Sequence, residues 1–164
     1  LAGGELLIDR EIDFGTRAVV SKLVETLDCS DNEALDLIER HGVTTGDESH
    51  STGKPAEGTQ AITGALTEIV KPQFLALARD IVRVRDYAVT ETRAGSGGAK
   101  IYAFGSLARW PNADRLLSQL CNIEIASINP FYGLQVSDNA IEVGDIGPIC
   151  GVAVATGLAL RDAS

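Results

Sequence analysis

The glycine and serine at positions 105 and 106 are the residues of this sequence best placed to contact a ligand. They interrupt an apolar run over residues 101–104 that is typical of a buried strand, and a helical pattern follows them. A glycine at such a strand–helix turn lets a phosphate, a ring or a ribose approach the backbone without meeting a Cβ atom. Gly105 and Ser106 are therefore candidate binding residues.

Other reactive side chains lack the neighbours that chemistry requires. His41 and His50 have no Cys, Asp or Glu at the spacing of a metal site. Ser49 and Ser51 flank His50 without the Gly-x-Ser-x-Gly context of a nucleophile. The glycine-rich run 95–100 precedes a strand, whereas a phosphate loop follows one, and no Ser or Thr comes after its lysine. We predict no catalytic residue and no metal site.

The elements that must position the Gly105 turn form a βαβ pattern over residues 100–131. Leucines at helical spacing predict a helix over 109–121, and Pro111 suits its first turn because proline lacks the amide hydrogen that a first turn leaves unpaired. Asn122 can end this helix, and a second strand is predicted over 123–126. We expect the two strands to be adjacent and parallel, since a right-handed crossover joins such strands.

Upstream of this unit, the pattern predicts one extended segment and two helices. Residues 5–14 alternate apolar and polar side chains, which predicts a β-hairpin on the same sheet. An apolar stripe over 19–27 predicts an amphipathic helix. Ser30 and Glu33 form a capping box that begins a second helix. Gly42 suits a left-handed conformation at the end of that helix.

The middle and the end of the chain predict a loop and further helices. Residues 43–58 are polar and contain three glycines, so we expect an exposed, flexible loop. Helical periodicity runs from about residue 59 to 92, and Pro72 within it predicts a kink or two successive helices. The apolar run 149–160 predicts a closing helix whose small residues allow close packing.

Composition narrows the class of protein. A length of 164 residues with 45% hydrophobic content suits one domain with a core, and a formal charge of −9 argues against a nucleic-acid partner. The longest apolar run is too short to cross a bilayer, and no leader pattern opens the sequence. Three cysteines without a Cys-x-x-Cys pair predict buried, reduced thiols. Leu1 is not an initiator residue, so we expect part of a longer polypeptide.

Several segments, in order, resemble the actin-like ATPases. Within that superfamily they are most similar to the PilM family of type IV pilus assembly proteins. The residues that match its adenosine-side motif are Tyr102, Gly105, Ala108, Pro111 and Asn129-Pro130-Phe131. Residues 4–12, 80–87 and 152–161 resemble that family's hairpin, long helix and closing helix.

This resemblance implies an α/β fold: a ribonuclease H-like subdomain that makes up half of an actin-like ATPase. Residues 1–164 would form a single α/β domain, with a helical insertion from about residue 17 to 72 as its satellite. In the family, a phosphate-contacting strand and turn lie just before the segment that matches residues 4–7. The present sequence starts after that turn.

The resemblance also bears on nucleotide binding. Where the family has three consecutive glycines, this sequence has Gly105, Ser106 and Leu107, and the leucine would fill the space of the adenine. A family lysine near the ribose corresponds to Glu39, although Arg40 follows directly. We therefore keep Gly105, Ser106 and Arg40 as candidate nucleotide contacts and expect no bound cofactor, with ATP an option for the full-length protein.

The function that the resemblance implies is a non-catalytic cytoplasmic scaffold. Such a protein would be recruited to the inner membrane by the cytoplasmic tail of a PilN-like platform protein, without inserting into the membrane itself. One alternative is a nucleotide-binding actin-like ATPase that needs its missing N-terminal half. Another is an FtsA-like filament or division protein, although residues 160–164 lack the basic amphipathic helix usual there. The oligomeric state stays open.

Overall fold

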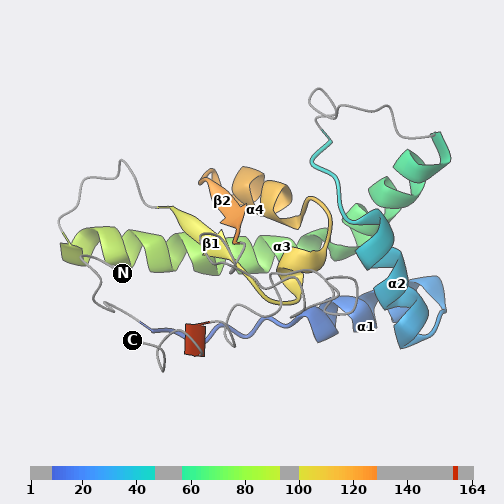
Figure 1. Cartoon of the computed structure of the whole chain (residues 1–164), viewed down its shortest axis with the longest axis horizontal. Coiled ribbons are helices and arrows are strands. Elements are labelled where there is room, and N and C mark those ends of the chain that lie inside the picture. Colours follow the sequence, from blue (N-terminus) through green and yellow to red (C-terminus); the bar gives the residue numbers. More distant parts are fainter. Residues whose placement is uncertain (1–8, 47–56, 93–99, 129–156, 159–164) are drawn as a thin grey trace, which may run out of the picture.

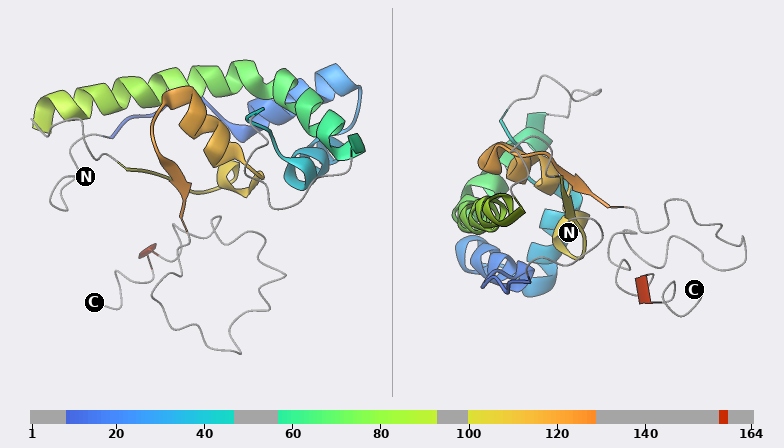
Figure 2. Two further views of the ribbon diagram at one scale, coloured as in Figure 1. Left: turned by 90° about the horizontal axis from the view of Figure 1, so that it is seen from above. Right: turned by 90° about the vertical axis from the view of Figure 1, so that its left-hand side faces the viewer.

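The computed structural model describes residues 9–46, 57–92, 100–128 and 157–158. The described part is mostly helical. In chain order its elements are α1 (Thr16–Leu27), α2 (Asp31–His41), α3 (Glu57–Thr92), β1 (Ile101–Ala103), the 3-10 turn η2 (Leu107–Arg109), α4 (Ala113–Cys121) and β2 (Ile125–Ser127). The long helix α3 forms the spine, with α4 and the sheet packed along its middle and with α1 and α2 gathered near its first half (Figures 1 and 2).

The first two helices follow the local sequence closely. Helix α1 buries Val19 and Leu23 from its apolar stripe. Helix α2 begins with the predicted capping box: the Glu33 amide donates to the Ser30 hydroxyl oxygen, and the Ser30 amide donates to the Glu33 carboxylate at 2.9 Å. These contacts satisfy backbone groups that the first turn of a helix otherwise leaves unpaired.

The segment upstream of α1 departs from the prediction. Residues 9–14 form no strand, and residues 5–8 lie outside the described part of the chain. The predicted alternation is nevertheless present, because Ile12 and Phe14 pack against the core while Glu11 and Asp13 are exposed. This segment bends at Asp13, where the Phe14 amide donates to the Ile12 carbonyl at 2.8 Å, and none of the described residues pairs with it as a neighbouring strand.

The link after α2 is more firmly held than its composition predicts. Gly42 has φ 66 and ψ −152, so its φ is positive as expected but its conformation is not left-handed helical. A Cβ atom here would overlap the carbonyl group of Pro111. Val43, predicted to lie in an exposed loop, is fully buried, and its amide donates to the Pro111 carbonyl at 3.0 Å. Residues 47–56 of that predicted loop lie outside the description, while 57 and 58 begin α3.

Helix α3 is one continuous element of 36 residues with Pro72 inside it. The prediction of two successive helices is therefore wrong. Figures 1 and 2 show the first turns of α3 bent away from the axis of the rest, which agrees with the predicted kink. The predicted boundary of a helical insertion at residue 72 falls within this helix, so that division of the chain stays a prediction.

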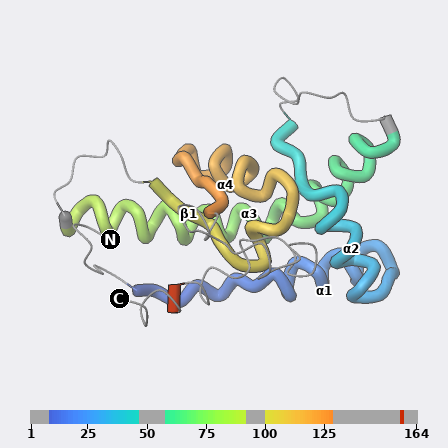
Figure 3. The backbone as a smooth tube through the Cα atoms, in the orientation of Figure 1, coloured from blue at the N-terminus to red at the C-terminus, as the bar shows by residue number. Residues whose placement is uncertain are grey.

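The βαβ unit is confirmed with shifted bounds. Strands β1 and β2 are parallel neighbours, with Ile101 opposite Ile125, and α4 connects them (Figure 3). The helix predicted over 109–121 begins only at Ala113, and Pro111 lies before its N-cap, Asn112, and so outside the first turn. Strand β1 ends one residue before Phe104, and β2 begins two residues after Ile123.

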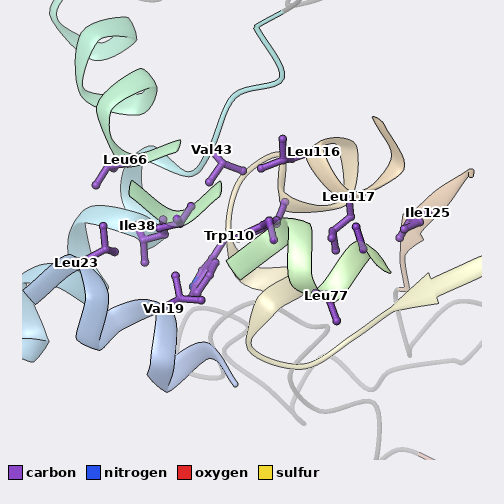
Figure 4. Close-up of a cluster of buried hydrophobic side chains, with 14 of the residues drawn as sticks. Val19, Leu23, Ile38, Val43, Leu66, Leu77, Trp110, Leu116, Leu117 and Ile125 are labelled. Atoms are coloured by element: carbon purple, nitrogen blue, oxygen red, sulfur yellow. The ribbon is translucent and has the colours of Figure 1, made fainter. Parts of the chain in front are cut away.

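Ring contacts between the long helix and the turn before α4 lie at the centre of the core. Phe74 of α3 is fully buried and Trp110 is 2% exposed, with their ring centroids 6.4 Å apart. Side chains from all four helices and β2 belong to the same buried cluster (Figure 4). The core therefore joins the helical first part of the chain to the βαβ unit, and it sets the position of the turn that carries Gly105.

Candidate functional site

The turn between β1 and α4 has the geometry that its sequence predicts. Gly105 has φ 85, a conformation that side-chain-bearing residues rarely adopt, and nothing lies within 4 Å of the position of a Cβ atom. Ser106 follows it and precedes η2, where the amide of Arg109 donates to the Ser106 carbonyl at 3.2 Å. Buried Trp110 then anchors the far end of the turn in the core.

An open groove of about 450 Å³ lies beside this turn. Leu77 and Ile81 of α3 contribute to its lining, together with strand β1, Ser106 and Leu107. Phe14, from the segment before α1, also lines it. None of the described lining residues carries a charge, so the groove offers apolar contact and a few hydroxyl groups.

The charged side chains near the turn pair with each other in a way that the sequence did not predict. Arg109, on η2, places its Nη2 atom 3.2 Å and 3.3 Å from the two carboxylate oxygens of Glu39 on α2. Each of the two side chains is about a third exposed. The Glu39 carboxylate, at the position where the resembling family has a lysine, therefore neutralises a cation at the turn.

Arg40 does not join the turn. Its guanidinium lies 2.6 Å from Asp36, one helical turn earlier on α2, and its side chain is 67% exposed. Among the candidate contacts, Ser106 lines the groove and Gly105 is its immediate neighbour in the turn, whereas Arg40 is absent from the described lining. The cation that lies at the turn is Arg109, which the sequence analysis did not identify. Its position two residues after Leu107 was the feature of the sequence that could have indicated it. Its pairing with Glu39, however, joins positions 70 apart in the chain.

Reactive side chains elsewhere in the described residues form no catalytic arrangement that we recognise. No group of three or more His, Cys, Asp or Glu in that part of the chain could hold a metal ion. Cys121 is buried, and burial raises the pKa of its thiol, with Arg85 acting weakly in the opposite direction. The prediction of buried thiols holds for Cys121, while Cys29 is half-buried and Cys150 lies outside the description.

Within the described residues, no helix combines the length and the apolar character that crossing a bilayer requires.

Comparison with solved structures shows a protein with a similar fold. No known family model matches the sequence, and no curated protein is similar to it at a significant level. Among solved structures, the chain is similar to one from a "PilM-PilN type IV pilus biogenesis complex", with a TM-score of 0.69 and 17% sequence identity. The similarity covers 98% of this chain but only 40% of that one. At this identity the match establishes a shared fold with a distant, pilus-related protein.

Proposed function

We propose that this chain is a non-catalytic scaffold module of a type IV pilus or related secretion platform, with an actin-like, ribonuclease H-like fold. In this role it acts at the cytoplasmic face of the inner membrane and binds the cytoplasmic tail of a PilN-like platform protein. The observation that carries the proposal is the structural similarity across 98% of the chain to a protein of the PilM-PilN complex.

The chemistry of the groove supports a non-catalytic role. A nucleoside triphosphate is held mainly by charge-assisted hydrogen bonds to its phosphates. The described groove lining contains no charged residue, and the nearby cation, Arg109, is paired with Glu39. Leu107 lines the groove where the resembling family has a glycine, so its side chain competes with a base for the same space.

One observation favours the alternative, a nucleotide-binding actin-like ATPase. The Gly105 turn faces open space, so a planar ring could approach its backbone. The matched structure is much longer than this chain, and further phosphate contacts could come from polypeptide outside residues 1–164. The two proposals therefore differ in the affinity that this chain has for ATP.

Calorimetric titration of ATP with magnesium into the purified chain separates them. We expect a dissociation constant of ~1 mM or weaker, equivalent to about −4 kcal/mol, because only the base and ribose would find contacts. A constant in the low micromolar range would overturn the non-catalytic proposal. In that case Gly105→Val should abolish binding, because it places a branched side chain in the open space above the turn.

The partner is tested separately with a labelled peptide. Its sequence is the cytoplasmic tail of the PilN-like protein encoded in the same genome, and it is titrated into the longest natural form of the protein. We expect saturable binding with a dissociation constant of roughly 1–10 μM, equivalent to about −8 to −7 kcal/mol. If a scrambled peptide binds equally well, the scaffold proposal loses its partner even if ATP also fails to bind.

A further inference from the structure

The ion pair between Glu39 and Arg109 leaves the guanidinium incompletely bonded. A single nitrogen, Nη2, lies 3.2 Å from one carboxylate oxygen and donates to the other at 3.3 Å. The strongest arginine–carboxylate pairs instead use two parallel hydrogen bonds of about 2.7–2.9 Å. The Nε atom of Arg109 is buried and has no hydrogen-bond partner among the described residues. Arg109 therefore retains donor capacity for a further acceptor once its side chain leaves Glu39.

Arg109 shares one side of its turn with Ser106. The Arg109 amide donates to the Ser106 carbonyl at 3.2 Å, and side chains three residues apart in a 3-10 turn eclipse each other. Ser106 lines the groove. The Arg109 side chain instead pairs with α2 and is absent from the described lining. The groove thus lacks a cation that the backbone of the turn places on the same side as Ser106.

The ion pair is not needed to hold α2 against this turn. The Val43 amide donates to the Pro111 carbonyl at 3.0 Å, and the side-chain amide of Asn112 donates to the Val43 carbonyl at 3.2 Å. Gly42 lies so close to Pro111 that no Cβ atom fits between them. Partly exposed ion pairs add little stability, and each partner here is about a third exposed. The effect of Glu39 on the turn is therefore mainly electrostatic.

We propose that Glu39 determines which ligands the Gly105 turn accepts. By holding Arg109 at α2, its carboxylate prevents phosphate-bearing ligands from binding beside Ser106. Without Glu39, the guanidinium and the Ser106 hydroxyl would supply donors on one side of the turn, an arrangement that suits phosphate oxygen atoms. The inference rests on the proposed non-catalytic function and names the residue that keeps the turn from binding nucleotides.

Separate titrations with inorganic triphosphate and with adenosine test the two halves of a nucleotide. Calorimetry is performed on the full chain without magnesium, because the metal ion would neutralise part of the phosphate charge. We expect Glu39→Gln to raise the affinity for inorganic triphosphate at least tenfold and to leave the affinity for adenosine unchanged. Adding Arg109→Gln should abolish the gain, because the released guanidinium is the contact. If Glu39→Gln gains no affinity, the proposal is overturned.

The matched control is Asp36→Asn, which removes one carboxylate from the same helix and releases Arg40 instead. It changes the net charge by the same amount, yet its affinity for inorganic triphosphate should equal that of the unmodified chain. An equal gain in both variants would overturn the proposal, because net charge and not release of Arg109 would then set the affinity. A similar gain for adenosine would also overturn it, since adenosine carries no phosphate.

The Nε–H resonance of Arg109 in nuclear magnetic resonance spectra gives a second readout that a purely structural role would not change. Arg109→Gln identifies this resonance by its absence. Inorganic triphosphate should shift it in Glu39→Gln and leave it in place in the unmodified chain, whereas equal shifts in both would contradict the role of Glu39.

Two further outcomes separate this inference from the proposed function. Thermal unfolding should show that Glu39→Gln is folded, and loss of the fold would overturn the inference because the ion pair would then be structural. Tight binding of ATP by the unmodified chain would contradict the proposed function, whereas the absence of a gain in Glu39→Gln contradicts this inference alone.

Discussion

Two regions of the described structure differ in how completely their apolar side chains are buried. Around Phe74 and Trp110, side chains from α1, α2, α3 and α4 enclose a core in which both rings are buried. Around β1, the groove is open and Tyr102 and Phe104 are more than half exposed. The same chain thus contains a closed helical region and an open sheet region.

This difference separates the residues that stabilise the chain from those that can contact further polypeptide. Burial of apolar surface is the main stabilising term in folding, so the closed region should hold most of the stability. The open region retains exposed aromatic side chains, Tyr102 and Phe104, beside the groove. Predictions on the two regions should therefore differ in size.

The largest expected effect comes from the centre of the closed region. Phe74→Ala should lower the free energy of unfolding by about 3–5 kcal/mol, because it removes a fully buried ring and leaves a cavity beside Trp110. Denaturant unfolding followed by circular dichroism measures the change. The matched control, Tyr87→Ala on the same helix, should cost less than about 1 kcal/mol because that side chain is 52% exposed. Equal losses would show that the closed core does not dominate stability.

The next effect lies where the helical region meets the βαβ unit. Gly42→Ala should destabilise the chain by about 3 kcal/mol, since alanine is strained at φ 66 and its Cβ would overlap the Pro111 carbonyl. Gly64→Ala is the matched control: this glycine is inside α3 with open space around it, so the change should stabilise by up to about 1 kcal/mol. Thermal unfolding of both variants checks the opposite signs. Destabilisation by both would indicate that general helix effects, and not the contact with Pro111, decide the result.

The smallest effect concerns the helix cap at the edge of the closed region. Ser30→Ala should cost about 1 kcal/mol, the usual loss for an N-cap serine. Hydrogen bonds from the Ser30 amide and hydroxyl hold the pKa of Glu33 below its ordinary value of 4.5. The contribution of Glu33 is therefore fully present above pH 4.5 and is lost as the pH falls through the folded pKa.

Stability measured between pH 3 and pH 7 tests this sign. Glu33→Gln should flatten the pH dependence in the acid range, while Glu25→Gln removes the separate effect of Lys22 on the Glu25 carboxyl, whose pKa is also lowered. If Glu33→Gln leaves the acid limb unchanged, the capping box does not contribute the expected pH dependence.

The parts of the fold that could be predicted depend on residues close together in the chain. The capping box of α2, the stripe of α1 and the glycine turn after β1 were all predicted because their physics acts over three or four residues. The hairpin predicted over residues 5–14 is not formed by residues 9–14, the part of it that the structure describes, although the alternation there was right. A strand needs a partner, and a single segment does not specify one.

The turn that carries the candidate site was predicted for the same reason, while ligand binding at Gly105 and Ser106 stays a prediction. Gly105 and Ser106 lie next to each other, and so the sequence was enough to place them together. The Glu39–Arg109 pair could not be predicted, because the two charges meet only after α2 and η2 pack around Trp110. The exposed position of Arg40 likewise depends on which face of α2 turns inward.

The sequence by itself therefore determined where α2 begins, which face of α1 is apolar and where the backbone turns at Gly105. Tertiary structure alone decided that Val43 is buried against Pro111, that Arg109 meets Glu39 and that an open groove lies beside β1. The physical reason is the distance along the chain between the residues that interact. Capping and periodicity are set by bonds within one or two helical turns, whereas burial and ion pairing depend on which distant segments come into contact when the core packs.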